Sequence, residues 1–341
     1  MQLSKPYLLF LGASQSLTDC KTAAGLRDWC RADVAGQMRL PGGTVDLGLP
    51  WYTPTAAAAA GARSLVIGVA PVGGSIPPEW WPALHEAVAA GLDVVSGMHT
   101  RLAAVPALAE AAAARGVRLL DVRHSDRTFA AASGARRPGR RLLTVGTDCA
   151  LGKKYTALAL TAALRALGIT ATFRATGQTG IMIAGGGVAI DAVIADFIAG
   201  AAEWLSPAND PAHWDVIEGQ GALFHPAYAG VTLGLIHGSQ PDALVLCHDP
   251  TRASIDGYAD FPIPSLGAAM SQYLAAARLT NPEARFVGIS LNTSALDAPR
   301  RHQAMAALGE EFGLPVVDPM VDGAHAIARV LAAQCPPGGA R

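Results

Sequence analysis

The sequence predicts an α/β protein of two domains, each built on a mainly parallel sheet flanked by helices. Three observations support this prediction. Short apolar runs alternate with helix-forming runs along most of the chain, many of these apolar runs end in loops that contain glycine, and a polar stretch with glycine and proline interrupts the alternation at 133–141. Strands that alternate with helices are typical of parallel sheets, because the crossover between two parallel strands needs a helix.

Four apolar runs in the first half of the chain predict buried strands, at 7–12, 64–70, 92–97 and 117–122. Helix-forming segments follow the first three of these runs and begin near Lys21, Glu79 and Ala107. This order of strands and helices predicts a parallel sheet in the first half of the chain.

The loops after these strands contain residues that could bind a ligand. Gly73 and Gly74 follow the second run, and His99 and Thr100 follow the third. Because ligands bind at the carboxyl ends of the strands in open parallel sheets, these residues could line a cleft. Lys21 could bind a second anion at a helix start. An ordinary helix start and loop residues without a ligand are the alternatives, so the role of these loops stays open.

The stretch Ser133–Arg141 is basic and contains glycine and proline, which is typical of a connection between domains. We therefore predict one domain at 1–135 and a second at 136–341. The arginines at 136–141 could instead bind nucleic acid, but Pro138 and Gly139 interrupt them and the net charge of the chain is only −1. We predict no nucleic-acid partner.

The second half begins with a strand, a loop between two glycines and a helix. The apolar run Leu142–Val145 leads to Gly146, Gly152 and Lys153 follow, and a helix-forming run covers 157–167. Backbone N–H groups in such a loop favour an anion, and Lys153 stands where a phosphate-contacting lysine is expected. We predict a phosphate-binding loop, with a purely structural glycine turn as the alternative.

This loop departs from the usual motif in two ways. Its two glycines are separated by one residue more than usual, and Lys154 stands in place of the Ser or Thr that helps to hold Mg²⁺. The missing hydroxyl argues against ATP hydrolysis but not against phosphate binding. Thr156 could replace that hydroxyl.

A strand at 214–217 places Glu218 at its carboxyl end, directly before Gly219-Gln220-Gly221. In a phosphate-loop protein an acid at this position either holds Mg²⁺ or acts on a nucleophile. His225 follows closely enough to belong to the same site. The alternative is that Glu218 is a capping or exposed loop acid.

Further strands are predicted at 169–174, 242–247, 284–291 and 315–319. Their ends carry Arg174, Arg252 and Asn292, and the loop at 175–180 contains Gln178 and Thr179.

The composition excludes several classes of protein. The chain has 341 residues, of which 51% are hydrophobic and 16% charged, so large apolar cores can form. Its five cysteines are scattered and form no CxxC pair, which argues against a disulfide framework and a zinc site, so no metal ligands are assigned. We expect no signal peptide and no membrane-spanning segment, and hence a cytoplasmic protein.

The spacing from Gly146 to Lys153, with Glu218 and Asn292 at later strand ends, resembles the dethiobiotin-synthetase-like branch of phosphate-loop proteins. That resemblance implies that Asn292 binds adenine. It also implies an ATP-dependent ligase or kinase that acts on a small carboxylate.

A closer resemblance is to a two-domain family long catalogued as a domain of unknown function. The stretches that carry it are 146–153, 175–181, 217–228 and 234–243, and less tightly 19–26. This resemblance implies a Rossmann-like N-terminal domain and a P-loop NTPase-like C-terminal domain. The Lys153-Lys154-Tyr155-Thr156 version of the motif resembles the DgcN group, which implies an acetyl-CoA-dependent N-acetyltransferase that acts on D-glutamate in D-amino-acid catabolism.

The chemistry of that reaction fits the residues. Coenzyme A carries a pyrophosphate and a 3′-phosphate, which the loop and Lys154 could bind, and no phosphoryl group is transferred, so Mg²⁺ is possible but not expected to be essential. Amine acetylation needs a base, for which Glu218 and His225 are candidates, and donors to the thioester oxygen. The expected acetyl-CoA contacts are Gly146, Thr147, Asp148, Gly152, Lys153, Lys154, Tyr155, Thr156 and Asn292, and the expected substrate contacts are Arg174, Gln178, Thr179, Gln220 and Arg252.

Two other functions stay open at this point. One is the ATP-dependent ligase or kinase, and the other is a nucleotide sensor without catalysis. The expected partner is a small amino-acid substrate, together with further copies of the chain in a homo-oligomer, and neither a nucleic acid nor a membrane. The stereochemistry of the substrate follows from the resemblance alone.

Overall fold

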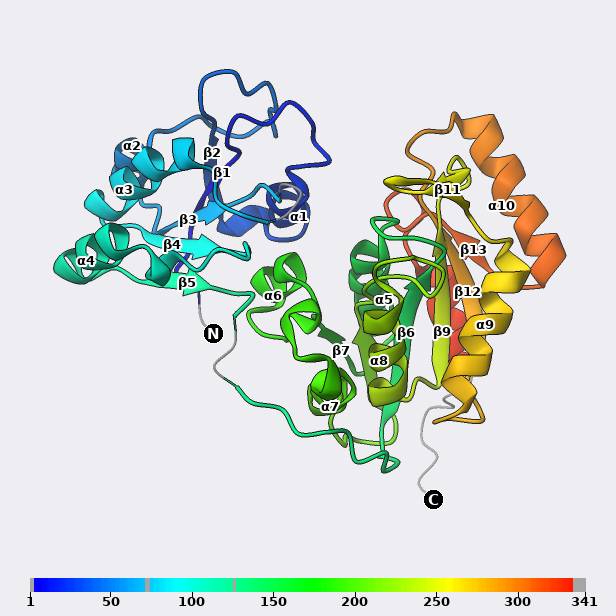
Figure 1. Ribbon diagram of the computed structural model, residues 1–341. Coiled ribbons are helices and arrows are strands. Elements are labelled where there is room, and N and C mark those ends of the chain that lie inside the picture. The colour runs from blue at the N-terminus through cyan, green and yellow to red at the C-terminus, as the bar shows by residue number, and fades with distance from the viewer. Residues whose placement is uncertain (1–2, 71–73, 125–126, 334–341) are drawn as a thin grey trace. The chain divides into compact units, whose positions relative to one another are not determined.

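The computed structural model describes residues 3–70, 74–124 and 127–333 (Figure 1). The chain divides into two compact units. The first contains Met1–Arg127 and Gly177–Ala192, and the second contains Thr128–Thr176 and Val193–Arg341. The segment 177–192 thus belongs to the first unit although it lies at the start of the second half of the chain.

The first unit contains a parallel sheet whose described strands lie in the order β2-β1-β3-β4-β5. All residues of β1, β3 and β4 are buried, as expected for strands covered by helices on both faces. The strands are β1 (Tyr7–Phe10), β2 (Val34–Met38), β3 (Ser64–Ile67), β4 (Asp93–Ser96) and β5 (Leu119–Asp121). The helices are α1 (Lys21–Trp29), α2 (Pro54–Ala59), α3 (Trp81–Ala89), α4 (Pro106–Arg115) and α6 (Gln178–Ala184), with short turns η1 (Arg31–Asp33), η2 (Pro78–Trp80), η3 (Leu102–Ala104) and η4 (Ile190–Ala192).

Helices cover both faces of this sheet (Figure 1). The helices α2, α3 and α4 pack against one another in sequence, whereas α1 packs against α6. The split follows from the strand order, because right-handed crossovers that run in opposite directions along a sheet place their helices on opposite faces.

The second unit contains a parallel sheet whose described strands lie in the order β13-β12-β9-β6-β8-β7. These strands are β6 (Arg140–Gly146), β7 (Ala171–Arg174), β8 (Trp214–Ile217), β9 (Ala243–His248), β12 (Arg285–Leu291) and β13 (Val316–Val317). An antiparallel hairpin of β10 (Ser254–Ile255) and β11 (Tyr258–Pro262) follows β9. The helices are α5 (Lys153–Ala166), α7 (Ile198–Leu205), α8 (Ala229–Ser239), α9 (Leu266–Arg278), α10 (Ala298–Phe312) and α11 (His325–Ala333), with the turn η5 (Ala195–Phe197).

The central strands of this sheet lie between two helical layers (Figure 1). The helices α5 and α11 pack together on one face, and α7, α8 and α9 pack in sequence on the other. Apolar side chains of β6, β8, β9 and β12 form one buried cluster with side chains of α8 and α9, and this cluster includes Leu143, Ile217, Leu244 and, from α9, Tyr273. This core fixes the carboxyl ends of β6, β8 and β9, where the phosphate loop and Glu218 begin.

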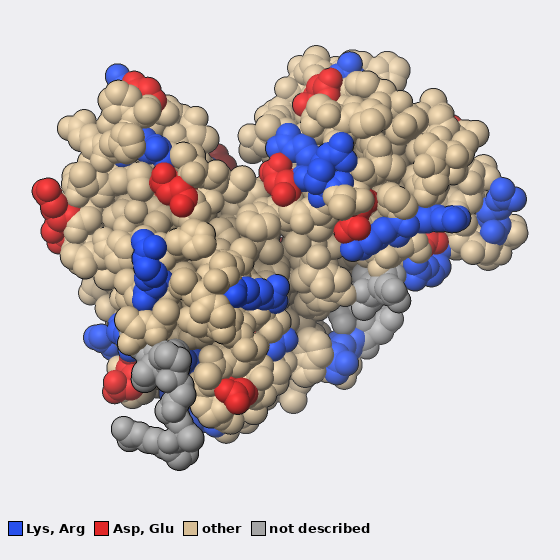
Figure 2. Space-filling view, turned by 180° about the vertical axis from the view of Figure 1, so that it is seen from behind, with Lys and Arg blue, Asp and Glu red and all other residues tan. Residues whose placement is uncertain are grey.

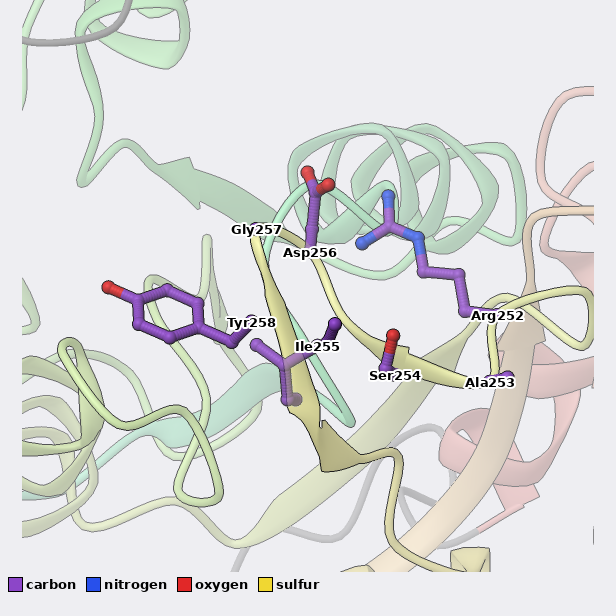
Figure 3. A pocket seen from close by; sticks show the side chains of 8 residues that line it. Arg252, Ala253, Ser254, Ile255, Asp256, Gly257 and Tyr258 are labelled. Atoms are coloured by element: carbon purple, nitrogen blue, oxygen red, sulfur yellow. The ribbon is translucent and has the colours of Figure 1, made fainter.

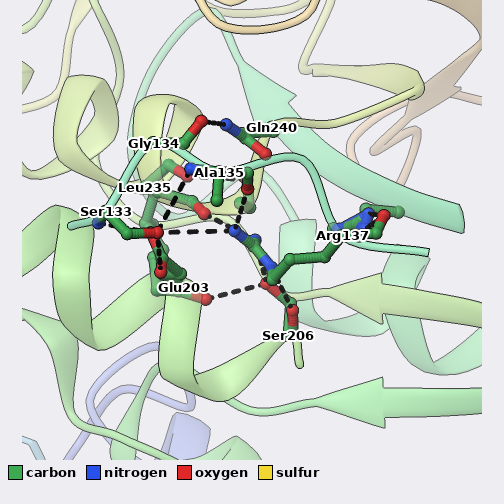
Figure 4. Close-up of polar contacts among 12 residues, drawn as sticks. Ser133, Gly134, Ala135, Arg137, Glu203, Ser206, Leu235 and Gln240 are labelled. Carbon is green, nitrogen blue, oxygen red and sulfur yellow. Dashed lines mark hydrogen bonds and ion pairs between the residues drawn. The ribbon is translucent and has the colours of Figure 1, made fainter. Parts of the chain in front are cut away.

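The stretch at 133–141 belongs to the second unit and makes hydrogen bonds to other segments of it (Figure 4). Ser133 donates its backbone N–H and its hydroxyl to Glu203, over 2.9 and 2.6 Å. Arg137 donates to the carbonyl oxygens of Ser206, at 3.0 Å, and Gly238, at 2.8 Å. Arg141 is 2% exposed. Arginines that the sequence presents as a basic run therefore hold backbone carbonyls of their own unit.

None of the helices among residues 3–70, 74–124 and 127–333 has the length and the apolar character that a membrane span requires. On the face shown in Figure 2, basic and acidic side chains lie close together on a mostly uncharged surface.

The two parallel sheets confirm the α/β fold class, and each predicted strand overlaps an observed one. The strand β2 was not predicted because its sequence, VAGQM, contains no apolar run. The prediction of a loop at 175–180 is wrong from Gln178 onward, where α6 begins.

Candidate functional site

The phosphate loop joins β6 to α5. Gly152 precedes α5 with φ +100°, which favours glycine, and Ala150 also has a positive φ of 52°. The buried hydroxyl of Tyr273 donates to the carbonyl oxygen of Gly146 over 2.7 Å and so fixes the end of the strand. The start of a helix favours an anion through its backbone N–H groups and its dipole, and anion binding by this loop stays a prediction.

Lys153 is folded back under this loop. Its side chain is 6% exposed, and its Nζ donates to the carbonyl oxygen of Asp148 over 2.7 Å. Burial lowers the pKa of Lys153, although neighbouring thiols and Asp148 act in the opposite direction. A phosphate placed in the loop would give this buried cation a negatively charged partner.

Asp148 is fully buried and ties the loop to the hairpin of β10 and β11. Its Oδ2 accepts hydrogen bonds from Nη1 of Arg252, at 2.7 Å, and from the backbone N–H of Asp256, at 2.9 Å. Arg252 also donates to the carbonyl oxygen of Cys149 over 2.9 Å. Arg252, predicted to bind substrate, thus already makes an ion pair with a buried carboxylate.

The remaining loop residues are held in different ways. The hydroxyl of Thr147 lies 2.9 Å from Nδ1 of His248. The buried hydroxyl of Thr156 lies 2.8 Å from that of Ser290 and donates to the carbonyl oxygen of Gly152 over 3.1 Å. Thr156 therefore has its hydroxyl bound within the protein, which argues against its use as a replacement Mg²⁺ ligand. Lys154 lies over the ring of Tyr155, with Nζ 4.8 Å from the ring centre.

Glu218 follows β8 and is 4% exposed. Its Oε2 accepts the backbone N–H of Thr176 at 3.0 Å, and its carbonyl oxygen accepts the Thr176 hydroxyl at 2.6 Å. The next residue, Gly219, passes so close to Thr144 that a Cβ would lie 1.7 Å from the Thr144 carbonyl oxygen and 3.1 Å from Cδ of Lys153. The segment after β8 therefore packs directly against the phosphate loop lysine.

His225 lies beside the loop and is 3% exposed. Its Nδ1 accepts the backbone N–H of Ala227 over 3.1 Å, and its ring packs against those of Tyr228 and Tyr258, at centroid distances of 4.5 and 5.1 Å. Burial lowers the pKa of His225, against an opposing effect of Asp148. An Nδ1 that accepts a hydrogen bond carries no proton, so in the neutral ring the proton is on Nε2.

His225, Asp148 and Cys149 offer ligand atoms that all lie within 4.8 Å of one another, which would suit a metal ion. The hydrogen bonds argue against that use. Nε2 of His225 could bind a metal only if the proton moved to Nδ1, which would break the bond from Ala227. Asp148 is already neutralised by Arg252. The same arrangement suits an anion, because Nε2–H of His225 is a donor.

Gln178 and Thr179, predicted to bind substrate, lie in the first unit. The amide oxygen of Gln178 accepts Nη2 of Arg123 at 2.9 Å, and the hydroxyl of Thr179 lies 2.9 Å from that of Thr22. Arg123 is 7% exposed and also donates to Gly97, over 2.9 Å, and to Asp191. Arg123 was not predicted, since a single arginine after a short strand gives no distinctive sequence pattern.

The other loop residues of the first unit that were considered as ligand contacts make few side-chain interactions that bear on a site. His99 donates its backbone N–H to the carbonyl oxygen of Gly74 over 2.7 Å, and burial lowers the pKa of its side chain. A Cβ at Gly74 would lie 2.2 Å from the His99 ring. Lys21 begins α1. Gly73 lies outside the described residues.

Comparison with protein families places both halves of the chain. A domain of unknown function described as the DUF1611_C P-loop domain matches residues 128–328, and the DUF1611_N Rossmann-like domain matches residues 38–125. The chain belongs to the DUF1611 family.

Three proteins similar to this DUF1611 chain are informative. It is 46% identical to the D-glutamate N-acetyltransferase of a Pseudoalteromonas species, over 96% of this chain and 98% of that protein. It is 49% identical to the D-glutamate N-acetyltransferase of Tritonibacter scottomollicae, over 97% and 99%. A crystal structure of a DUF1611 family protein from Anabaena variabilis superposes with a TM-score of 0.85 at 35% identity and covers 97% of this chain and 100% of that one.

In this DUF1611 chain, the remaining predicted site residues lie near strand ends and are half-buried. Arg174 donates through Nε to the buried Asp215 at 2.7 Å. Asn292 is half-buried and donates to Asp249 over 3.4 Å. The carbonyl oxygen of Gln220 accepts the hydroxyl of Thr232 at 2.7 Å. Their roles toward ligands stay predictions.

Proposed function

We propose that this protein transfers the acetyl group of acetyl-CoA to the amino group of D-glutamate. The observation that carries this proposal is the identity of 46% and 49%, over nearly the whole chain, to two proteins named as D-glutamate N-acetyltransferases. The described site supports it with a phosphate loop, a buried lysine and a buried carboxylate in one unit.

Acetyl transfer to an amine has simple requirements. The substrate ammonium loses one proton to a base, and its nitrogen attacks the thioester carbonyl to form the C–N bond. The C–S bond then breaks, and a second proton passes from the nitrogen to the leaving sulfur, so that coenzyme A leaves as the thiol. A base must remove the proton, and N–H donors must stabilise the negative oxygen of the intermediate. No step requires the metal ion or the Ser/Thr hydroxyl that the loop lacks at Lys154.

We assign the base to Glu218. A neutral His225 whose Nδ1 accepts from Ala227 has no lone pair at Nε2, so it is a donor rather than a base. Glu218 is a buried carboxylate at the carboxyl end of β8, and a carboxylate can accept a proton, whereas a neutral His225 with its proton on Nε2 cannot. We place the coenzyme A phosphates against the loop from Gly146 to Lys153, with Lys154 toward an additional phosphate.

We place the reaction in the cytoplasm, since its donor is an intracellular thioester and the four described cysteines form no disulfide. We expect a homo-oligomer, which light scattering of the purified protein would measure.

The test of the function is a direct assay. The purified chain with acetyl-CoA and D-glutamate should release the coenzyme A thiol and yield N-acetylglutamate by mass spectrometry, with L-glutamate as the comparison. Acetyl-CoA should raise the melting temperature. A stabilising effect of Mg-ATP with no effect of acetyl-CoA and no acetylated product would overturn the proposal.

The base assignment is tested by Glu218→Gln, which keeps the size and the bond from Thr176 but removes the proton acceptor. We expect kcat to fall by about 10²–10⁴-fold. Full kcat in this variant at all pH values would show that Glu218 is not the base.

A further inference from the structure

Three exposed aromatic rings gather beside the phosphate loop. Tyr228, Tyr258 and Phe261 are 52%, 37% and 46% exposed. Tyr228 and Tyr258 both pack on the ring of His225, and the rings of Tyr258 and Phe261 lie 6.1 Å apart and nearly perpendicular. Single exposed apolar residues are ordinary, but a contiguous exposed group marks an interaction site.

The hairpin of β10 and β11 places two of these rings. A two-stranded hairpin is marginal on its own, so it needs an anchor. That anchor is Asp148, which binds both the side chain of Arg252 and the backbone of Asp256. Figure 3 shows Arg252 and Asp256 on one side of the hairpin, whereas Tyr258 extends from the other. The residues from Arg252 to Ala259 line a cavity of about 400 Å³.

This surface is chemically complementary to a nucleotide. The loop and Lys153 favour phosphate, and flat aromatic rings at its edge favour a planar base, to which they offer stacking. We propose that Tyr228, Tyr258 and Phe261 form a subsite for the purine base of the acyl donor, whose phosphates lie in the loop that ends at Lys153. This subsite replaces the adenine contact predicted at Asn292. The identity of the donor as acetyl-CoA rests on the proposed function; the subsite requires only a purine nucleotide.

The other possible occupant is a second copy of this chain. All five residues of β11 are exposed, so this strand could also pair with a neighbouring subunit. The link to the phosphate loop through Asp148 favours the nucleotide, because a surface used only for subunit contact needs no connection to an anion site. The test separates the two occupants.

The experiment measures the binding of three probes, pyrophosphate, ADP and coenzyme A, to the full chain by calorimetry. Wild type should bind ADP more tightly than pyrophosphate. Tyr258→Ala and, independently, Phe261→Ala should each lower the affinity for ADP and for coenzyme A by about 5- to 150-fold and leave the affinity for pyrophosphate unchanged. Tyr258→Phe, which keeps the ring, should recover the affinity. Leu279→Ala removes an apolar side chain that is 77% exposed elsewhere in the second unit and serves as the control.

Each result has a definite meaning once circular dichroism shows that the variants are folded. An equal loss of affinity for pyrophosphate and ADP, or no loss of affinity for either, overturns the proposal of a purine subsite. A change from oligomer to monomer with unchanged ADP affinity also overturns it and assigns the surface to a subunit interface. Ring-dependent ADP binding without any coenzyme A binding supports the subsite but contradicts the proposed acetyl donor.

Discussion

Gly219 shows how a single missing side chain can shape this site. The segment after β8 must pass close to Thr144 to bring Glu218 beside the phosphate loop, and no Cβ fits between them. The same closeness places Gly219 against the stem of Lys153. The glycine after the strand-end acid is therefore required by packing, before any role of its N–H as a donor.

Gly219→Ala should consequently destabilise the fold. A Cβ 1.7 Å from a backbone oxygen forces the two strands apart, and overpacking of this kind costs about 1–3 kcal/mol or more. Gly230→Ala is the matched control, since nothing lies within 4 Å of its Cβ and it is in α8, where alanine is neutral or stabilising by up to ~1 kcal/mol. Urea unfolding of both variants checks this; equal stability of the two would contradict it.

His225 allows a test at the level of one proton. If its Nε2–H is a donor, His225→Gln, whose amide nitrogen can take a similar position, should keep most of kcat and raise KM modestly. His225→Phe should lose more because it has no donor. If His225 were the base instead, both variants would lose about 10²–10⁴-fold in kcat. Steady-state kinetics of the two variants, measured side by side, distinguish these outcomes.

The β10–β11 hairpin is held to the phosphate loop by an ion pair that should also contribute to the stability of the fold. Arg252 lies on the segment that leads into it, and its partner Asp148 has no exposure to solvent. A buried carboxylate that loses its cation keeps the cost of desolvation without compensation.

Arg252→Ala should therefore destabilise the protein by about 3–5 kcal/mol. Arg300→Ala is the control: its side chain is 76% exposed and its pair with Asp297 spans 3.8 Å, so the loss should be within about 0.5 kcal/mol. Thermal unfolding of both variants gives the comparison. A small effect at Arg252, together with a large rise in KM for D-glutamate, would instead support the predicted substrate contact.

Most of the strands that the sequence predicted contain an apolar run. The strand β2 was not predicted because one of its buried residues is polar. Gln37 is completely buried because its side chain donates to Leu49 and accepts from Leu47, and both partners lie on a later loop. Likewise, strand-end reasoning located Glu218 and Lys153, whereas it gave no sign that Arg252 would face Asp148. Such pairings depend on segments about a hundred residues apart and leave no local pattern.

Three buried histidines should make the stability of the whole molecule sensitive to mild acid. Burial lowers the pKa of His213, His225 and His248 below the ordinary value of 6.5. The unfolded chain thus binds these protons more readily than the folded one. Their contribution is complete above about pH 6.5 and is lost as the pH falls through the lower folded values.

The free energy of unfolding should accordingly fall between pH 6.5 and 5, with a slope of up to about 1.4 kcal/mol per pH unit for each histidine that stays neutral. His248→Asn, which can retain a bond to Thr147, should reduce that slope, and His302→Asn, at an exposed position, should not. Urea titrations at several pH values measure the slope. Equal slopes in all three proteins would contradict the role of His248.

The assignment of 177–192 to the first unit has a consequence for how the chain is made. During synthesis, residues 1–127 leave the ribosome long before α6 exists, so Arg123 at first lacks both Gln178 and Asp191, and α1 lacks the helix that it packs against. The N-terminal unit can reach its final form only after more than half of the chain has been translated. A fragment that ends where the two family models meet would lack α6 and Asp191 permanently. The N-terminal unit therefore needs a segment of the second half of the chain in order to fold completely.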